Sequence, residues 1–151
     1  MKDVSKELLN QMLVESFNEI LVIQEAYMQA NCVMDVTMNE IHVLEAIDRF
    51  ESPTMAQVST VMMVTPGTLT TSVKRLVQKG YAIRKQDPSD RRIYHLSITD
   101  KARRILAVHD QFHDMMINGI VNNPDVDLPS VAHTMESLLK FFHQIKKEYV
   151  K

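Results

Sequence analysis

Residues 65 to 75 combine hydroxyl groups with positive charge and contain no carboxylate. Threonine hydroxyls can hydrogen-bond to phosphate oxygens and base edges, and the threonine methyl group can contact thymine. Lysine and arginine neutralise phosphate charge. The residue types in this stretch therefore favour contact with a nucleic acid. The candidate contact residues are Thr65, Pro66, Gly67, Thr68, Thr70, Thr71, Lys74 and Arg75.

A second charged group lies in the sequence Asp87-Pro88-Ser89-Asp90-Arg91-Arg92. Proline, serine and aspartate are typical turn residues, so the two arginines are expected at the tip of a loop. A carboxylate close to an arginine can hold its guanidinium by a bidentate pair. We therefore interpret Arg91 and Arg92 as groups that contact the ligand, and Asp90 as the residue that orients Arg92.

The charge of the chain is concentrated around these two groups. The net charge is only −2, but residues 71–104 hold ten lysines and arginines against three acids, a net +7. The rest of the chain carries −9. A solvated charged face is the ordinary explanation of such a run. Together with the hydroxyl-rich stretch, however, the cationic segment matches the electrostatic footprint of a protein that contacts phosphates.

Two helices and two strands are predicted to position these side chains. Apolar residues at helical spacing predict two short helices that pack together, with the buried faces Met55, Val58 and Met62, and Leu69, Val73, Leu76 and Val77. Thr65 can cap the second helix, Pro66 suits its first position, and Gly80 ends it. Strands are predicted over residues 81–86 and 93–98. This order is that of a winged helix-turn-helix, so the fold class is mainly α with a small β-hairpin wing (α+β).

The segments on either side are predicted to be long helices with wide apolar faces. One helix spans residues 5 to 31, and two more follow Thr99, with a break at residues 122–124. A capping box from Thr37 to Glu40 begins a further helix that ends near Phe50. A surface helix needs only one apolar stripe, so the wider faces of the terminal helices indicate a second partner and favour a dimer.

Four motifs together resemble the MarR family of bacterial transcriptional regulators. They are Thr65-Pro66-Gly67-Thr68, Leu76-x-x-Lys79-Gly80, Asp87-Pro88-x-Asp90-Arg91-Arg92 and Ile98-Thr99-Asp100-Lys101. Met63 and Ala102 stand where the family often has glycine. The resemblance implies a homodimer whose two recognition helices read a pseudo-palindromic site on double-stranded DNA.

The resemblance also implies a division of the chain and a role for the wing. Residues 1–151 would form a single MarR-type domain, in which residues 36–99 are the DNA-binding part. Residues 1–35 and 100–151 would supply the dimerisation helices. In related wings the arginine at the position of Arg92 enters the minor groove of DNA. Arg91 is the other candidate, and the sequence does not separate the two.

A closer resemblance is to the MarR-type repressors of fatty-acid synthesis genes in Gram-positive bacteria. It is carried by Ile20 to Glu25, Asn39 to His42, Met63 to Thr65, Gly67-Thr68, Thr70 to Ser72, Gly80-Tyr81, Asp90 to Arg92, His95-Leu96 and His109 to His113. It implies that a long-chain acyl group on acyl carrier protein is the corepressor, held in an apolar tunnel beside the dimer interface. No other cofactor is implied. Eleven methionines suit an adaptable apolar lining, although methionines are also ordinary core residues.

Three histidines and one cysteine provide alternative regulatory hypotheses. His109 and His113 are adjacent at i, i+4, and His42 lies on an earlier helix. Some MarR-like regulators sense zinc with ligands from these helices, so the three are candidate zinc ligands. They can equally be structural or pocket polar groups. Cys32 suggests a peroxide sensor, but its neighbours provide no cation to lower the thiol pKa, which favours a packing role.

Other function classes fit the sequence less well. It has no glycine-rich phosphate loop, nucleophile elbow or paired-cysteine motif, so no enzyme and no catalytic residue is predicted. A winged helix that binds only protein is a rival class, but it would have no need of the concentrated positive charge. The charged N-terminus, the lack of a long apolar run and the single cysteine predict a cytoplasmic protein without a membrane partner.

Overall fold

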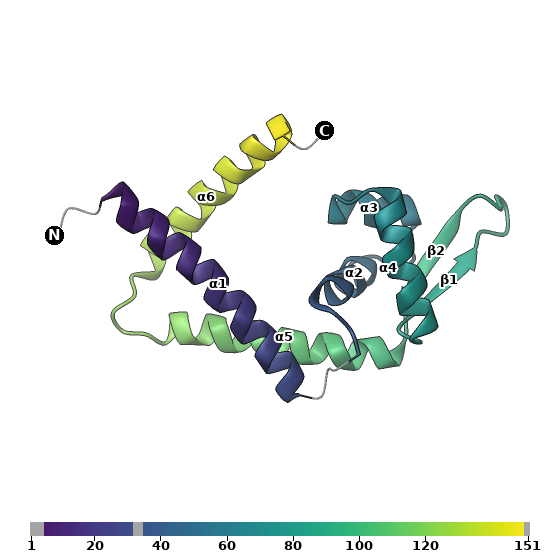
Figure 1. Ribbon diagram of the computed structural model, residues 1–151, viewed down its shortest axis with the longest axis horizontal. Coiled ribbons are helices and arrows are strands. Elements are labelled where there is room, and N and C mark those ends of the chain that lie inside the picture. The colour runs from purple at the N-terminus through teal and green to yellow at the C-terminus, as the bar shows by residue number, and fades with distance from the viewer. Residues whose placement is uncertain (1–4, 32–34, 150–151) are drawn as a thin grey trace. The chain divides into compact units, whose positions relative to one another are not determined.

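The computed structural model describes residues 5–31 and 35–149. Along the chain, the elements are α1 (Lys6–Ala30), α2 (Met38–Asp48), α3 (Met55–Met62), α4 (Pro66–Gln78), β1 (Ala82–Gln86), β2 (Tyr94–Ile98), α5 (Asp100–Val121) and α6 (Leu128–Tyr149). Figure 1 shows them in order. The chain forms two compact units, Met1–Phe112 and His113–Lys151, which divide within α5. The predicted order of helix, helix and hairpin is confirmed.

Local capping interactions fix where the helices begin. The Thr37 hydroxyl and the Glu40 carboxylate form the predicted capping box at α2, and Thr54 and Gln57 form a second one at α3. At α4, the Thr65 hydroxyl accepts from the Thr68 N–H at 3.2 Å, directly before Pro66. These side chains satisfy backbone N–H groups that have no partner inside a helix.

The core of the first unit forms where α2, α3 and α4 pack against the hairpin. Its most deeply buried side chains include Leu44, Val58, Leu69, Leu76 and Leu96. The predicted buried face of α4 is confirmed at Leu69, Val73 and Leu76, but Val77 is 39% exposed. Val77 follows Leu76 directly, and successive helix residues point about 100° apart, so the two side chains do not share the core-facing side.

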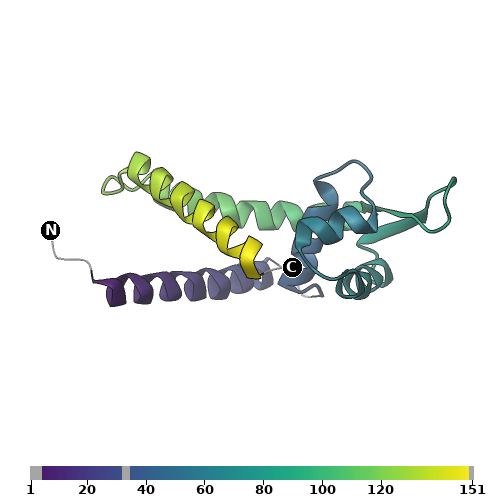
Figure 2. The ribbon, with the colours of Figure 1, turned by 90° about the horizontal axis from the view of Figure 1, so that it is seen from above.

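The wing is a two-stranded antiparallel sheet that is attached to the helices beside it. Its register runs from Ala82 opposite Ile98 to Gln86 opposite Tyr94. The Leu96 N–H donates to the Pro53 carbonyl at 2.8 Å, and Thr54 forms a β-bridge with His95. The loop between α2 and α3 therefore runs along β2. In both views the turn of the hairpin projects away from α4 (Figures 1 and 2).

The long flanking helices leave much apolar surface exposed. In α1 only Gln24 and Met28 are buried. Its exposed apolar side chains are Leu8, Leu9, Met12, Leu13, Val14, Phe17, Ile20, Leu21, Val22 and Ile23. In the second unit, α6 has no fully buried residue and exposes Met135, Leu139, Phe141, Phe142 and Ile145. Among the described residues, no helix is long and apolar enough to span a bilayer.

Candidate nucleic-acid interface

The first turns of α4 present a row of threonines on the exposed side of the helix. Thr70 donates its hydroxyl proton to the Pro66 carbonyl at 2.7 Å, and Thr71 donates to the Gly67 carbonyl at 3.1 Å. Their hydroxyl protons are therefore used within the helix, and each side chain presents oxygen lone pairs and a methyl group outward. Acceptors and methyl groups suit the amino groups and thymine methyls of a major groove.

The remaining predicted residues of α4 are exposed as well. Gly67, Thr68, Lys74 and Arg75 are all exposed, as is Pro66 at the start of the helix. Lys74 and Arg75 follow the threonines along the helix, so the polar face becomes cationic toward its C-terminal half. All eight candidate residues, Thr65 included, are therefore exposed. Their contact with DNA remains a prediction.

At the tip of the wing, Arg92 is held in place by Asp90. Arg92 Nε donates to Asp90 Oδ1 at 3.1 Å, and Nη2 donates to Oδ2 at 3.0 Å. The Arg92 backbone N–H also donates to Oδ1 at 2.9 Å. The Arg92 side chain is nevertheless 90% exposed. The bidentate pair expected from the sequence is therefore present, and the hydrogen bonds from Arg92 lower the pKa of Asp90.

Arg91 is exposed beside this pair but is fixed through its backbone. Its carbonyl accepts from Gln86 Nε2 at 2.6 Å, which closes the turn across the two strands. The structure thus shows a carboxylate that orients Arg92 and a backbone contact that orders Arg91. Both arginines remain candidates for the minor groove.

Asp87 is the centre of the turn and was not identified from the sequence as a functional residue. Its Oδ1 accepts from the Ser89 N–H at 2.8 Å, the Ser89 hydroxyl at 2.6 Å and the Asp90 N–H at 3.1 Å. Its Oδ2 accepts from His95 Nε2 at 2.8 Å. These donors hold the pKa of Asp87 well below its usual range, with the Ser89 hydroxyl making the largest contribution and His95 the next.

A groove of about 440 Å³ separates the start of α4 from the wing. Leu69 and Thr70 line its helix side, and Arg84, Arg92 and Tyr94 line its wing side. The Arg84 guanidinium lies 3.7 Å above the centre of the Tyr94 ring. Arg84 pairs with Leu96 in the hairpin, so Tyr94 is its diagonal neighbour. The sequence predicts both strands but not their register, and this stacked cation depends on the register.

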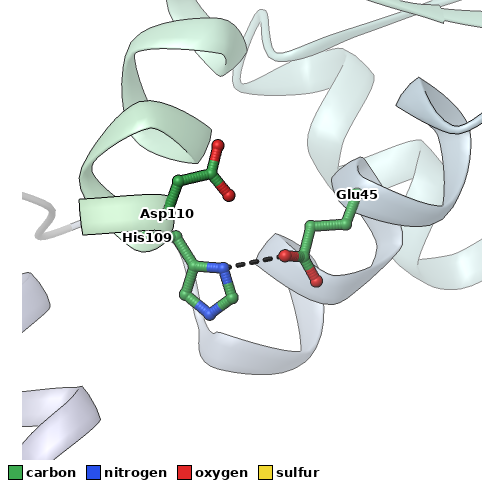
Figure 3. Close-up of side chains that lie close together, drawn as sticks. All are labelled: Glu45, His109 and Asp110. Atoms are coloured by element: carbon green, nitrogen blue, oxygen red, sulfur yellow. Dashed lines mark hydrogen bonds and ion pairs between the residues drawn. The ribbon is translucent and has the colours of Figure 1, made fainter. Parts of the chain in front are cut away.

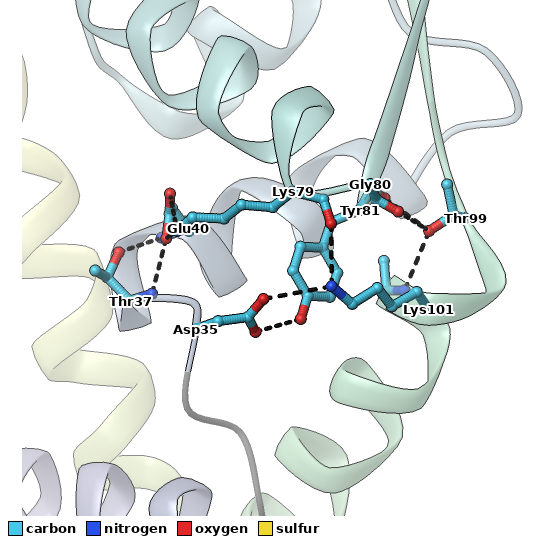
Figure 4. Close-up of polar contacts among 9 residues, drawn as sticks. Asp35, Thr37, Glu40, Lys79, Gly80, Tyr81, Thr99 and Lys101 are labelled. Atoms are coloured by element: carbon cyan, nitrogen blue, oxygen red, sulfur yellow. Dashed lines mark hydrogen bonds and ion pairs between the residues drawn. The ribbon is translucent and has the colours of Figure 1, made fainter.

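Behind this face, a polar network joins the end of α4 to α2 and α5 (Figure 4). Lys79 Nζ contacts the two carboxylate oxygens of Glu40 at 2.9 and 2.8 Å. Lys101 Nζ donates to the Lys79 carbonyl at 3.0 Å and to Asp35 Oδ2 at 3.3 Å, and the Tyr81 hydroxyl donates to Asp35 Oδ1. These contacts connect the C-terminal end of α4, the predicted recognition helix, to the segment that leads into α2.

Two electrostatic effects accompany this network. Burial would raise the pKa of Glu40, but Lys79 and the Thr37 N–H outweigh it and hold that pKa below its usual value. Burial and the hydrogen bond to Asp35 raise the pKa of the Tyr81 hydroxyl. The charged carboxylates and the neutral phenol are therefore the stable forms near neutral pH.

His109 is the centre of a second buried polar group (Figure 3). Its side chain is 1% exposed, its Nδ1 lies 2.8 Å from Glu45 Oε1, and its Nε2 lies 2.6 Å from Gln24 Nε2. The rings of His42 and His109 pack edge to face, with centroids 5.6 Å apart. Within the described ranges, donor atoms of Glu45, His109 and Asp110 all lie within 4.8 Å of one another. Of the three candidate zinc ligands, only His109 belongs to this group, and Cys32 lies outside the described residues.

Taken together, these features define a winged helix-turn-helix protein with an exposed recognition helix and a wing that carries a fixed arginine. The sequence model of the MarR family matches residues 36–94. FabT from Streptococcus pneumoniae, solved in complex with DNA, is 31% identical over 95% of this chain and 99% of its own, with a TM-score of 0.84. The chain therefore belongs to the MarR family of DNA-binding transcriptional regulators.

More distant structures share the fold alone. YusO from Bacillus subtilis is 21% identical, covering 90% of this chain and 98% of its own, with a TM-score of 0.64. A MarR protein from Peptoclostridium difficile is 20% identical, covering 98% of this chain and 93% of its own, with a TM-score of 0.71. No protein with a curated function matches the sequence.

Proposed function

We propose that the protein is a cytoplasmic repressor that binds a pseudo-palindromic operator as a homodimer and controls fatty-acid synthesis genes. Its corepressor would be a long-chain acyl group on acyl carrier protein. The observation that carries the DNA-binding part is the pairing of an acid-free threonine face on α4 with Arg92, which is 90% exposed and held by Asp90. Helix and wing then read the major groove and the adjacent minor groove.

The wing can be tested with Arg92→Ala. We expect this variant to bind the operator roughly tenfold more weakly or worse, because it loses a charged group that contacts the groove. The melting temperature should not fall, since the side chain is almost wholly exposed. Fluorescence anisotropy at fixed salt measures the affinity, and Arg49→Ala, an exposed arginine outside both the wing and the cationic segment 71–104, serves as the matched control. Wild-type affinity in Arg92→Ala would remove the wing from the mechanism.

The charge distribution provides a second test of the same function. If Lys74, Arg75 and the wing arginines contact phosphates, the logarithm of the binding constant falls linearly with the logarithm of the salt concentration. Removing one phosphate contact should reduce that slope by about one counterion. Binding that is insensitive to salt would favour a winged helix that binds only protein.

Dimerisation is supported by the apolar surface of the flanking helices. The ten exposed apolar side chains of α1 and the exposed stripe of α6 would cost free energy in water and require cover. A second copy of the chain covers them symmetrically and sets two recognition helices about one DNA turn apart. This arrangement explains why the operator would be a pseudo-palindrome.

The acyl ligand is supported by the resemblance to the fatty-acid synthesis repressors and by a cavity at the junction of α1 and α2. The cavity has a volume of about 500 Å³, within the usual range for ligand sites. Half of its lining is apolar, from Met28, Val36, Met38 and Ile41, and half is polar, from Glu25, Gln29, Thr37 and Asn39. The apolar face of α1 adjoins it in sequence and could extend the lining when a partner subunit covers that face.

Native mass spectrometry of the purified dimer tests this assignment. A bound acyl chain or acyl carrier protein would support it, and operator affinity should then increase when acyl carrier protein loaded with a long-chain acyl group is added. Unloaded carrier protein is the control. A dimer that carries neither ligand, and whose DNA affinity does not respond to the loaded carrier, would contradict the acyl assignment without affecting DNA binding.

A zinc-responsive or other small-ligand-responsive repressor is the second candidate. The observation that favours zinc is the group of Glu45, His109 and Asp110, which offers one nitrogen and two oxygen donors. These donors fit an open zinc site, in which water or another ligand completes the coordination. Here Glu45 and Asp110 would supply carboxylate oxygens and His109 would supply Nδ1. Stoichiometric zinc in the native mass spectrum, lost in His109→Ala, would favour this candidate.

A further inference from the structure

Both ring nitrogens of His95 face oxygen atoms that can only accept hydrogen bonds. Nδ1 lies 3.0 Å from the Ser52 carbonyl oxygen, and Nε2 lies 2.8 Å from Asp87 Oδ2. A neutral imidazole carries a single N–H and can satisfy only one of these acceptors. The imidazolium satisfies both. Both contacts of His95 can be hydrogen bonds at once only when the ring is charged and doubly protonated.

His95 connects the wing to the body of the winged helix. On one side, Ser52 belongs to the loop between α2 and α3. On the other side, Asp87 collects the backbone N–H groups of Ser89 and Asp90, and Asp90 in turn holds Arg92. A continuous series of contacts thus runs from the α2–α3 loop through the imidazolium to the guanidinium at the wing tip.

We propose that His95 is a positioning residue for DNA binding, and that loss of its proton weakens operator affinity by releasing the turn that presents Arg92. The inference rests on the proposed contact between Arg92 and DNA. His95 itself need not touch DNA. Its effect is transmitted through Asp87 and Asp90, which explains why neither the charge pattern nor the turn motif revealed it.

The groups around His95 determine the direction of the pH dependence. Asp87 is the carboxylate in direct contact, Lys85 stands opposite His95 in the hairpin register, and Glu51 precedes Ser52 on the loop. The Ser52 carbonyl, followed by Asp87, raises the pKa of His95 above its ordinary value of 6.5. We call the contacts of protonated His95 with Ser52 and Asp87 the brace. A raised pKa means that the brace is complete below that ordinary value and is lost as the pH rises through the raised value.

The experiment measures operator affinity between about pH 6 and about pH 9 at constant ionic strength, the range in which histidine titrates. In the wild-type dimer we expect affinity to fall roughly fivefold over this range. This is about the change expected when one partly exposed ion pair is lost. His95→Gln removes the titrating group and should bind weakly at every pH, without this slope. His133→Gln on α6 controls for other histidines and should keep the wild-type slope.

Asp87→Asn provides an isosteric variant. Its amide oxygen can still accept from the Ser89 and Asp90 N–H groups, whereas its nitrogen can only donate toward His95. The neutral ring is then favoured, so the midpoint of the affinity curve should move to lower pH. An NMR titration of the His95 ring in the full-length protein without DNA should show the same displacement of its pKa.

Two outcomes would overturn the inference. One is a His95 pKa in the free protein at or below the ordinary value. The other is a His95→Gln variant that keeps the wild-type pH slope. An Arg92→Ala, His95→Gln double variant separates this inference from the proposed function. If the brace acts through Arg92, His95→Gln should add almost nothing in the Arg92→Ala background. If Arg92→Ala alone has no effect on DNA binding, the proposed role of the wing fails instead.

Discussion

At the scale of single residues, Glu40 has two tasks that reinforce each other. Its carboxylate completes the capping box of α2 by accepting from the Thr37 N–H at 2.9 Å. It also receives Lys79 from the end of the recognition helix, and its side chain is only 4% exposed. A buried carboxylate is tolerated when donors surround it, and it becomes costly when one of them is removed. The orientation of α4 is thus linked to the start of α2.

Glu40→Gln tests this link while preserving the shape of the side chain and the cap. At neutral pH we expect a loss of about 1 to 3 kcal/mol in the free energy of unfolding, because the charged pair with Lys79 is lost. The lowered pKa of Glu40 means that its contribution is complete above the ordinary value of 4.5 and is lost as the pH falls through the lowered value. The difference in the free energy of unfolding between wild type and variant should therefore disappear in acid.

Melting temperatures measured between neutral pH and about pH 3 check this sign. Glu136→Gln is the matched control, because Glu136 pairs with Lys140 at 2.7 Å on an exposed helix face. Exposed pairs of this kind contribute only about 0.5 kcal/mol or less. A difference in melting temperature between wild type and Glu40→Gln that widened as the pH fell would contradict the assigned ion pair.

At the scale of elements, the turn between α3 and α4 is built on an unusual backbone conformation. Met63 ends α3 with φ 55° and ψ 40°, and it is the one residue other than glycine with a positive φ in the described part of the chain. This left-handed conformation allows the chain to reverse tightly before Thr65 begins α4. The family often has glycine at this position, and Met63 adopts the same conformation at some steric cost.

Substitutions at Met63 should rank in a fixed order of stability. Met63→Gly removes the Cβ that makes the conformation costly and should stabilise the fold by up to about 1 kcal/mol, offset in part by the freer unfolded chain. Met63→Val should destabilise it by about 1 kcal/mol, since branched side chains tolerate positive φ poorly. Urea denaturation measures both. Because Met63 is 51% exposed, lost packing contributes little. A valine variant as stable as the glycine variant would contradict this account.

The elements also show why some features could be predicted and others could not. Helix starts at Thr37 and Thr65 depend on residues three positions apart, so the sequence contains the whole signal. The Asp90 and Arg92 pair is local in the same sense. The contact of His95 with Ser52 spans 43 positions and depends on where β2 meets the α2–α3 loop. The contact of Lys101 with Asp35 spans 66. Interactions of this kind are products of the fold, and no short pattern predicts them.

At the scale of the whole molecule, most of the apolar surface that the first unit leaves uncovered lies on α1. Its polar residues Glu7, Gln11, Glu15 and Asn18 form a separate stripe along the same helix. A helix with a broad apolar face and one narrow polar stripe is typical of an element packed against several others. Dimer formation and folding are therefore expected to be coupled, so that stability depends on protein concentration.

Phe17→Asp should disrupt the dimer. Phe17 is 53% exposed within one chain, and a carboxylate at this position would be buried without a partner in the assembled dimer. Analytical ultracentrifugation should show a shift toward monomer, and operator affinity should fall at least tenfold as the second half-site contact is lost. Gln11→Asp, on the polar stripe, introduces the same group and should remain dimeric. A dimeric Phe17→Asp variant would place the interface elsewhere.

The pair between Asp90 and Arg92 also limits what the wing can read. A guanidinium has five N–H donors, and Asp90 occupies one on Nε and one on Nη2, which leaves three, two of them at the outer end of the group. The two donors presented end-on can satisfy N3 and O2 acceptors at the floor of the minor groove, where A·T and T·A pairs look alike. The wing would then report groove width and A·T content, and the order of bases would be read by the threonines of α4.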